Sequence, residues 1–208
     1  MLGALLARDG ALAEPIAVEG SSEAALTTTL TSGRIDACTL VLIAGRAGTG
    51  PDDVASLALQ AAGGTLTHHG FALHPGGATG LGTLPGTDAI PVVLLPGEPL
   101  ACLVAYDIVA SRLVRRLAGA KRLSAYRTAE FELARKIVSA IGMVEVVPVR
   151  LDGGRALPMG VDGGLAGAIR ADGFVIVPDT SEGYLPGGRV RVHLYDSKQT
   201  ATAREIES

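Results

Sequence analysis

The sequence predicts an α/β domain with a mostly parallel sheet, followed by a small all-β domain of barrel-like type. Up to about residue 119, apolar runs of strand length alternate with segments of helical pattern, the order expected of an α/β layer structure. The runs 38–44 (CTLVLIA) and 90–95 (IPVVLL) are apolar without interruption, which is typical of strands buried on both faces of a parallel sheet. After about residue 124, short strand candidates are separated by glycine-containing turns instead.

Local signals define the elements of the first domain. Ser21 or Ser22 is placed to cap a helix, and Asp52 or Asp53 is placed to cap the next one. Asp9-Gly10 and Gly63-Gly64 mark helix ends. In chain order we expect helices over 1–8, 21–32, 52–62 and 100–117 and strands over 14–18, 38–44, 65–71 and 90–95.

The second domain contains strand candidates over 144–150, 174–178 and 189–195, with turns at 152–154, 162–164 and 186–188. We therefore expect an α/β domain over 1–122, a β domain over 123–196 and a polar tail over 197–208.

Composition excludes several classes of function. The 208 residues carry 18 Lys and Arg against 21 Asp and Glu, so the chain has no excess of positive charge that would favour binding to nucleic acid. Tryptophan is absent and aromatic residues make up 3%, which argues against stacking platforms for bases. No apolar run reaches the roughly 20 residues that span a bilayer, and residues 1–7 lack the basic start of a signal peptide. We expect a cytoplasmic protein that binds neither nucleic acid nor membranes.

The first candidate ligand loop, 44–53 (AGRAGTGPDD), follows a buried strand and opens a helix. Its glycines would let the backbone approach a ligand closely, and the amides of an opening helix attract anions. Arg46 adds a guanidinium for phosphate, and Asp52 and Asp53 are candidate Mg²⁺ ligands. A glycine-rich turn with an Asp cap and no ligand is the alternative. The predicted ligand contacts in this loop are Gly45, Arg46, Gly48, Thr49 and Gly50.

The second loop is Pro96-Gly97-Glu98-Pro99, a stiff turn at the carboxyl end of a strand, where open α/β sheets bind ligands. Glu98 would repel a phosphate, although it would accept a hydrogen bond from a ligand amine or bind a cation. Alternatively, Glu98 is the cap of the long helix, where its charge suits the helix dipole.

Histidines 68, 69 and 74 suggest a metal, but His68 and His69 would point to opposite faces of a strand and share no site. His74, before Pro75-Gly76, is better placed for a ligand at the same sheet edge.

Three stretches together resemble the molybdopterin molybdenumtransferases of the MoeA and gephyrin-E type. The stretches LIAGRAGTGPDDV (42–54), FALHPGGATGLG (71–82) and LLPGEPLAC (94–102) occur in the order and at about the spacing of the family motifs SGGxSxGxxDY, KPGKP and LPGNPVSA. The stretch AIRADGFVIV (168–177) is similar to the family's closing β domain.

The resemblance implies a molybdopterin-binding, MogA-like α/β domain followed by the family's C-terminal β domain. It also implies that the first strand of the α/β domain and two further domains lie ahead of Met1. It further implies a homodimer and a transferase that inserts molybdate into adenylylated molybdopterin with Mg²⁺, releasing AMP. Its motifs match Gly45, Gly50, Asp53, Pro75-Gly76, Pro96-Gly97 and Pro99.

The chain departs from the family at most polar positions. Ser, Gly and Ser of the first motif are Ala44, Arg46 and Gly48, both lysines are replaced, by His74 and Gly77, and Asn is Glu98. Lost cations and a gained carboxylate weaken the binding of a polyanion, by roughly 1.5–3 kcal/mol for each charge-assisted hydrogen bond.

We therefore expect molybdate insertion, with two alternatives: a non-catalytic molybdopterin carrier or sensor, or a degenerate interaction module. If a pterin ligand binds, we expect it between 45–53, 74–77 and 96–99. Arg46 would then hold its phosphate, and Asp53 would be the catalytic carboxylate that faces the metal or oxyanion.

Overall fold

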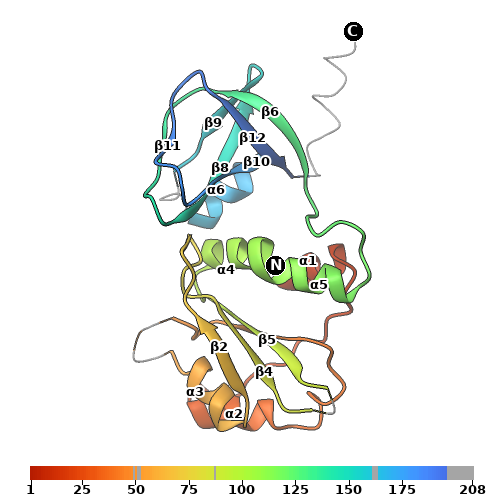
Figure 1. Ribbon diagram of the computed structural model, residues 1–208. Coiled ribbons are helices and arrows are strands. Elements are labelled where there is room, and N and C mark those ends of the chain that lie inside the picture. The colour runs from red at the N-terminus through yellow and green to blue at the C-terminus, as the bar shows by residue number, and fades with distance from the viewer. Residues whose placement is uncertain (49, 51–52, 87, 161–163, 196–208) are drawn as a thin grey trace. The chain divides into compact units, whose positions relative to one another are not determined.

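The computed structural model describes residues 1–48, 50, 53–86, 88–160 and 164–195. The chain divides into two compact units (Figure 1). The first contains Met1–Phe71 and Gly76–Leu123, and the second contains Ala72–Pro75 and the chain from Ser124 onward. The short segment Ala72–Pro75 thus belongs to the second unit, while the residues on both sides of it belong to the first. No helix of the described residues is long and apolar enough to cross a membrane.

The sheet of the first unit has the order β1-β5-β4-β2. Its strands are β1 (Val41–Ala44), β2 (Thr65–His69), β4 (Gly80–Leu84) and β5 (Ile90–Leu95). The α/β class is confirmed, but the expectation of a mostly parallel sheet is wrong, because only β1 and β5 are parallel and the β5–β4 and β4–β2 pairs are antiparallel. Strand β4 (GLGTL) escaped prediction because glycine has low strand propensity. The short loop from β4 to β5 forces an antiparallel hairpin.

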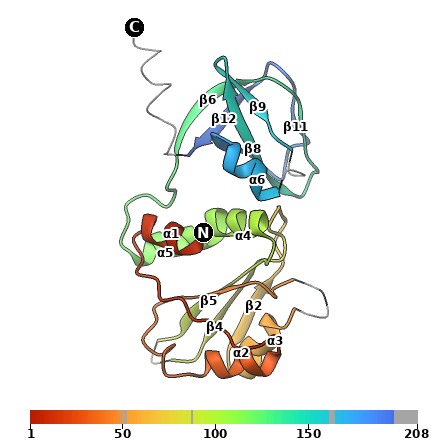
Figure 2. The same ribbon diagram turned by 180° about the vertical axis from the view of Figure 1, so that it is seen from behind.

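Helices cover both faces of this sheet. Helices α2 (Glu23–Leu30) and α3 (Ala55–Ala61) lie on one face, and α1 (Leu2–Arg8), α4 (Pro99–Ala105) and α5 (Ser111–Leu117) on the other (Figures 1 and 2). The predicted long helix is present as α4, a π-helical turn η1 (Tyr106–Ala110) and α5 in succession. Ser22 caps α2 as predicted, since its Oγ accepts a hydrogen bond from the amide of Ala25 at 3.2 Å.

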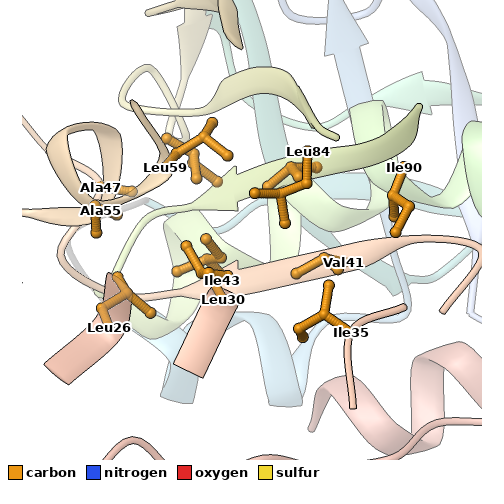
Figure 3. Close-up of a cluster of buried hydrophobic side chains, with 13 residues drawn as sticks. Leu26, Leu30, Ile35, Val41, Ile43, Ala47, Ala55, Leu59, Leu84 and Ile90 are labelled. Carbon is orange, nitrogen blue, oxygen red and sulfur yellow. The ribbon is translucent and has the colours of Figure 1, made fainter. Parts of the chain in front are cut away.

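Strand β5 separates two hydrophobic cores. Val92 and Leu94 face the α2–α3 side, where they pack with Leu26, Leu30 and Ile43 (Figure 3). Val93 and Leu95 face the other side, toward α1, α4 and η1. Alternate side chains of a strand point to opposite faces, so the uninterrupted apolar run of β5 reflects burial on both sides.

The strand expected over 14–18 is not formed. The structure gives residues 11–18 no strand, although Ile16 packs against the α2–α3 core. Pro15 has no amide hydrogen to donate to a sheet ladder. A strand also needs a neighbouring strand, and β1 pairs with β5 alone in the part of the chain that the structure describes.

A buried ionic network joins α1 to the long helix. The Asp9 carboxylate, with a fully buried side chain, accepts hydrogen bonds from Arg8 at 2.7 Å, from Arg115 at 3.0 Å and from the hydroxyl of Tyr106 at 3.0 Å. Arg8 also contacts Asp107 at 3.1 Å. Burial alone would raise the pKa of Asp9, but the hydrogen bonds from Arg8, Arg115 and Tyr106 together lower it below its ordinary value. Burial and the neighbouring Asp9 carboxylate raise the pKa of Tyr106.

This network predicts acid sensitivity of the first unit. The pKa of Asp9 is lower in the folded protein than in the unfolded chain. The contribution of its ionised carboxylate to the free energy of unfolding is therefore complete above the unfolded pKa of about 4, and it is lost as pH falls through the folded pKa. We expect the urea midpoint to fall between pH 4 and pH 2 more steeply in the unmodified protein than in Asp9→Asn. Circular dichroism at 222 nm reports mainly this unit, because α1 to α5 belong to it and α6 is the one described helix of the second unit. Parallel pH curves for the two proteins would contradict the assignment.

The second unit is a small barrel, as predicted. Its strands follow the order β10-β12-β6-β9-β8, and β8 pairs with β10 to close the ring. The strands are β6 (Arg127–Leu133), β8 (Val144–Asp152), β9 (Arg155–Pro158), β10 (Gly173–Val177) and β12 (Arg189–Leu194). Strand β3 (Leu73–His74) pairs with β8, and β7 (Ile137–Val138) pairs with β11 (Gly183–Tyr184). Helix α6 (Gly164–Arg170) was not predicted, because glycines interrupt its sequence, GLAGAIR.

Candidate functional site

The loops that follow β1 and β5 meet at the carboxyl edge of the first unit's sheet. The amide of Gly45 donates a hydrogen bond to the carbonyl of Leu95 at 2.9 Å. A Cβ atom on Gly97 would lie 3.4 Å from the Cα of Gly45, so both glycines permit a close approach of the two backbones. Gly45 also has φ 92°, which favours glycine. The structure therefore brings together the first two loops that the sequence singled out.

A pocket of about 270 Å³ lies beside this junction. Its walls combine apolar side chains of the segment before α2 with the end of β1: Ile16, Val18, Gly20, Ser22, Leu26, Ile43, Ala44, Gly45 and Arg46. Sequence reasoning missed the wall formed by residues 16–22, because an irregular segment has no periodicity that would show which way its side chains face.

Arg46 lies at this pocket with its guanidinium turned back onto the chain. Its Nη1 donates a hydrogen bond to the carbonyl oxygen of Ser21, which joins the two sides of the pocket. The residue has φ 56°, a left-handed conformation that is uncommon outside glycine. The side chain is exposed, so a ligand oxygen could reach the guanidinium in competition with this backbone carbonyl.

Asp53 is held inside the first loop rather than at a helix cap. Its Oδ2 accepts a hydrogen bond from the amide of Gly50 at 2.6 Å. A Cβ on Gly48 would lie 2.5 Å from the same oxygen, so a larger residue at position 48 would displace the carboxylate from this position. The prediction that Asp53 caps the next helix is wrong: that position belongs to Val54, because the chain turns once more before α3 starts at Ala55. Thr49 and Asp52 lie outside the described residues.

Glu98 caps α4, as the alternative interpretation held. Its carboxylate oxygens accept hydrogen bonds from the amides of Leu100 at 3.1 Å and Ala101 at 2.6 Å. Pro99 follows in the first turn, where its missing amide hydrogen costs nothing. Both loops at the junction thus hold a carboxylate of this chain against their own backbone amides.

The third predicted loop divides between the two units. His74 and Pro75 belong to the second unit, where Nδ1 of His74 lies 3.6 Å from Oε1 of Glu145. Gly76 belongs to the first unit, and its carbonyl accepts a hydrogen bond from the buried Thr79 hydroxyl at 2.6 Å.

His69, which the sequence analysis set aside, contacts the first loop through Nε2, 3.2 Å from the carbonyl of Ala47. No group of three or more His, Cys, Asp or Glu side chains within the described ranges is arranged to hold a metal ion.

Comparisons with known proteins agree with this architecture. Residues 1–116 match the family described as probable molybdopterin binding domain, and residues 130–195 match the MoeA C-terminal region, domain IV. A protein named for molybdopterin biosynthesis, from Methanocaldococcus jannaschii, is 28% identical over 134 residues, which are 63% of this chain and 30% of that protein.

Two archaeal structures share the fold. A molybdenum cofactor biosynthesis protein from Pyrococcus furiosus aligns with a TM-score of 0.73 and 24% identity, over 93% of this chain and 62% of that one. A MoeA protein from Pyrococcus horikoshii aligns with a TM-score of 0.63 and 29% identity, over 83% of this chain and 40% of that one. The chain thus spans about a third to three fifths of the length of these relatives. It belongs to the molybdopterin-binding domain family, with a MoeA-type C-terminal domain after it.

Proposed function

We propose that the chain acts in molybdenum cofactor biosynthesis by binding a molybdopterin-type ligand at the carboxyl edge of the β1–β5 pair. The observation that carries the proposal is the close approach of Gly45 and Gly97 beside the pocket at Arg46. The pocket joins aliphatic side chains to a guanidinium, and most of its exposed lining surface is polar. Here Ile16, Val18 and Ile43 would contact the pterin ring, and Arg46 would bind the phosphate.

The reaction that we assign to this site is the insertion of molybdate into adenylylated molybdopterin, with release of AMP. The protein's part is to hold the pterin phosphate and the oxyanion in position. Asp53 offers a carboxylate of the type that Mg²⁺ takes in combination with substrate phosphates. When bound, Mg²⁺ would neutralise phosphate charge. The contacts from His74, Pro75 and Thr49 remain predictions from the sequence, and a homodimeric state remains an implication of the resemblance.

Replacing Arg46 by alanine is expected to weaken binding of adenylylated molybdopterin by about 1.5–3 kcal/mol, since a bidentate charge-assisted contact is lost. Isothermal titration with molybdopterin and with its adenylylated form, each with and without molybdate, measures the effect. Arg112→Ala, which removes an exposed guanidinium from α5, is the matched control and should leave affinity unchanged. Equal affinities of the unmodified protein and Arg46→Ala for the ligand would show that Arg46 does not bind its phosphate.

A second candidate, a carrier or sensor that binds without turnover, is favoured by the two carboxylates at the junction. Asp53 and Glu98 already satisfy backbone amides that an anionic substrate would otherwise meet. Release of AMP from adenylylated molybdopterin in the presence of molybdate separates the two functions, because a carrier would bind the compound and leave it intact. If neither pterin compound binds, the interaction-module alternative is the one left.

Glu98→Gln is expected to tighten binding of the phosphorylated ligand by about 1 kcal/mol, because a negative charge near the phosphate is removed. The glutamine carbonyl still accepts a hydrogen bond from the start of α4, so the helix cap is largely retained. Glu132→Gln on β6 makes the same charge change at an exposed position of the barrel and should have no effect. A ligand bound through its amines would show the opposite sign, with weaker binding in Glu98→Gln.

A further inference from the structure

His69, the last residue of β2, is tied to the backbone of the first loop. Strands β1, β5 and β2 all run in the same direction, because β1 is parallel to β5 and β4 is antiparallel to both β5 and β2. The carboxyl end of β2 therefore lies at the same edge of the sheet as the two loops of the candidate site. There Nε2 of His69 lies 3.2 Å from the carbonyl oxygen of Ala47. A carbonyl oxygen only accepts, so Nε2 carries a hydrogen and donates it.

A β-bulge gives His69 this position. The register of β2 against β4 shifts between Leu66 and His68, so Thr67 is an extra residue in the strand. Side chains alternate between the faces of a strand, and one inserted residue moves every later side chain to the opposite face. Leu66 packs against the core that contains Ala47, on the α2–α3 side of the sheet (Figure 3). The bulge thus directs His69 to the face of Leu66 and the first loop, where a regular strand would direct His68.

The hydrogen bond fixes the orientation of the peptide group between Ala47 and Gly48. In a planar trans peptide the C=O and N–H bonds point in opposite directions. With the carbonyl of Ala47 directed at His69, the amide hydrogen of Gly48 is directed away from it. Gly48 is half-buried, and its amide has no acceptor among the residues that the structure describes. The loop therefore holds one unused backbone donor two residues after Arg46.

We infer that His69 is a positioning residue for the first loop, which holds the Gly48 amide ready for the anionic group of the ligand beside Arg46. The inference rests on the proposed function, and His69 acts through the backbone without touching the ligand. A backbone amide gives an anionic oxygen a charge-assisted hydrogen bond. Without the imidazole, the 47–48 peptide group loses its anchor, and ligand binding then has to order it. The side chain of His69 is exposed at the end of an edge strand, so its loss affects affinity rather than folding.

The test compares two variants of His69 with one of its neighbour. His69→Phe removes the donor and keeps a planar ring, His69→Gln keeps an N–H donor, and His68→Phe is the matched control on the same strand. We expect His69→Phe to weaken binding of adenylylated molybdopterin about fivefold in isothermal titration, the equivalent of one net hydrogen bond. His69→Gln should restore the affinity to within about twofold, and His68→Phe should leave it unchanged. Titrations with molybdopterin alone and with molybdate alone distinguish the pterin phosphate from a free oxyanion as the group that the Gly48 amide binds.

A measurement without ligand separates this inference from the proposed function. The amide nitrogen of Gly48 belongs to the peptide group that His69 holds, so its NMR chemical shift should change in His69→Phe and stay near its original value in His68→Phe. An unchanged Gly48 signal in His69→Phe, or an unchanged affinity, would overturn the inference. Equal losses of affinity in His69→Phe and His69→Gln would overturn it too, because packing rather than donation would then be the role of the ring. If the unmodified protein bound none of these compounds, the proposed function would fail and the ligand role of His69 with it, while the Gly48 signal would still report the hydrogen bond.

Discussion

Replacing Asp9 by alanine is expected to lower the free energy of unfolding of the first unit by about 3–5 kcal/mol, the cost of breaking a buried ion pair from one side. The fully buried carboxylate accepts from Arg8, Arg115 and Tyr106, and its removal leaves two guanidinium groups and a buried hydroxyl without this partner. The loss also removes polar contacts between the end of α1 and the long helix that follows β5, while the apolar contacts of Leu2, Leu5 and Leu6 remain.

Urea unfolding followed by circular dichroism at 222 nm measures this effect. Asp152→Ala is the matched control, because that carboxylate lies 3.8 Å from Arg150 and both side chains are more than half exposed. An exposed pair of this kind contributes about 0–1 kcal/mol. If the two variants differed from the unmodified protein by the same small amount, the Asp9 network would have no special role in stability.

Replacing Gly82 by valine is expected to cost about 3 kcal/mol or more, because the new side chain has no space in β4. Its Cβ would overlap the carbonyl oxygen of Thr65 on the neighbouring strand and would lie 2.8 Å from Cδ2 of Leu59 in α3. The backbone carbonyl belongs to the β2–β4 ladder and cannot move without breaking it.

The thermal midpoint and the exchange of β2 amides report this substitution. Thr83→Val tests the same strand without adding volume, and it should change stability by about 1 kcal/mol or less. Unaltered exchange in β2 of Gly82→Val would mean that the strands can separate at no cost, contrary to the packing described here.

In the second unit, glycine turns and the alternation of polar and apolar residues predicted some strands and missed others. Three strands of the barrel, β8, β10 and β12, lie within about two residues of the predicted positions. The middle of β8 is a buried apolar run, β10 is apolar throughout, and the first four residues of β12 alternate exposed and buried positions. Strand β9 was missed, since four residues are too few for a periodic pattern, and β3 belongs to this unit only through its pairing with β8.

The candidate site was likewise predicted only in part from the sequence. The glycine loops after two apolar strands pointed to one sheet edge, because the carboxyl ends of parallel neighbours lie together. The partners of Asp53 and Glu98 did not follow from the sequence: a carboxylate beside a glycine loop suits a metal, a ligand amine or its own backbone equally well. Only the folded distances, 2.6 Å from Asp53 to Gly50 and 2.6 Å from Glu98 to Ala101, distinguish these.

By itself the sequence determined the two-part α/β and β organisation, the buried strands β1 and β5, the long helix after β5 and the resemblance to the family. These depend on runs and periods of apolar residues, which act locally. The tertiary structure decided the direction of β4, the glycine contacts that make β4 possible, the burial of Asp9 and the pocket wall at 16–22. Each of these depends on which distant backbone comes to lie beside a residue, and that pairing is encoded by no single segment of the chain.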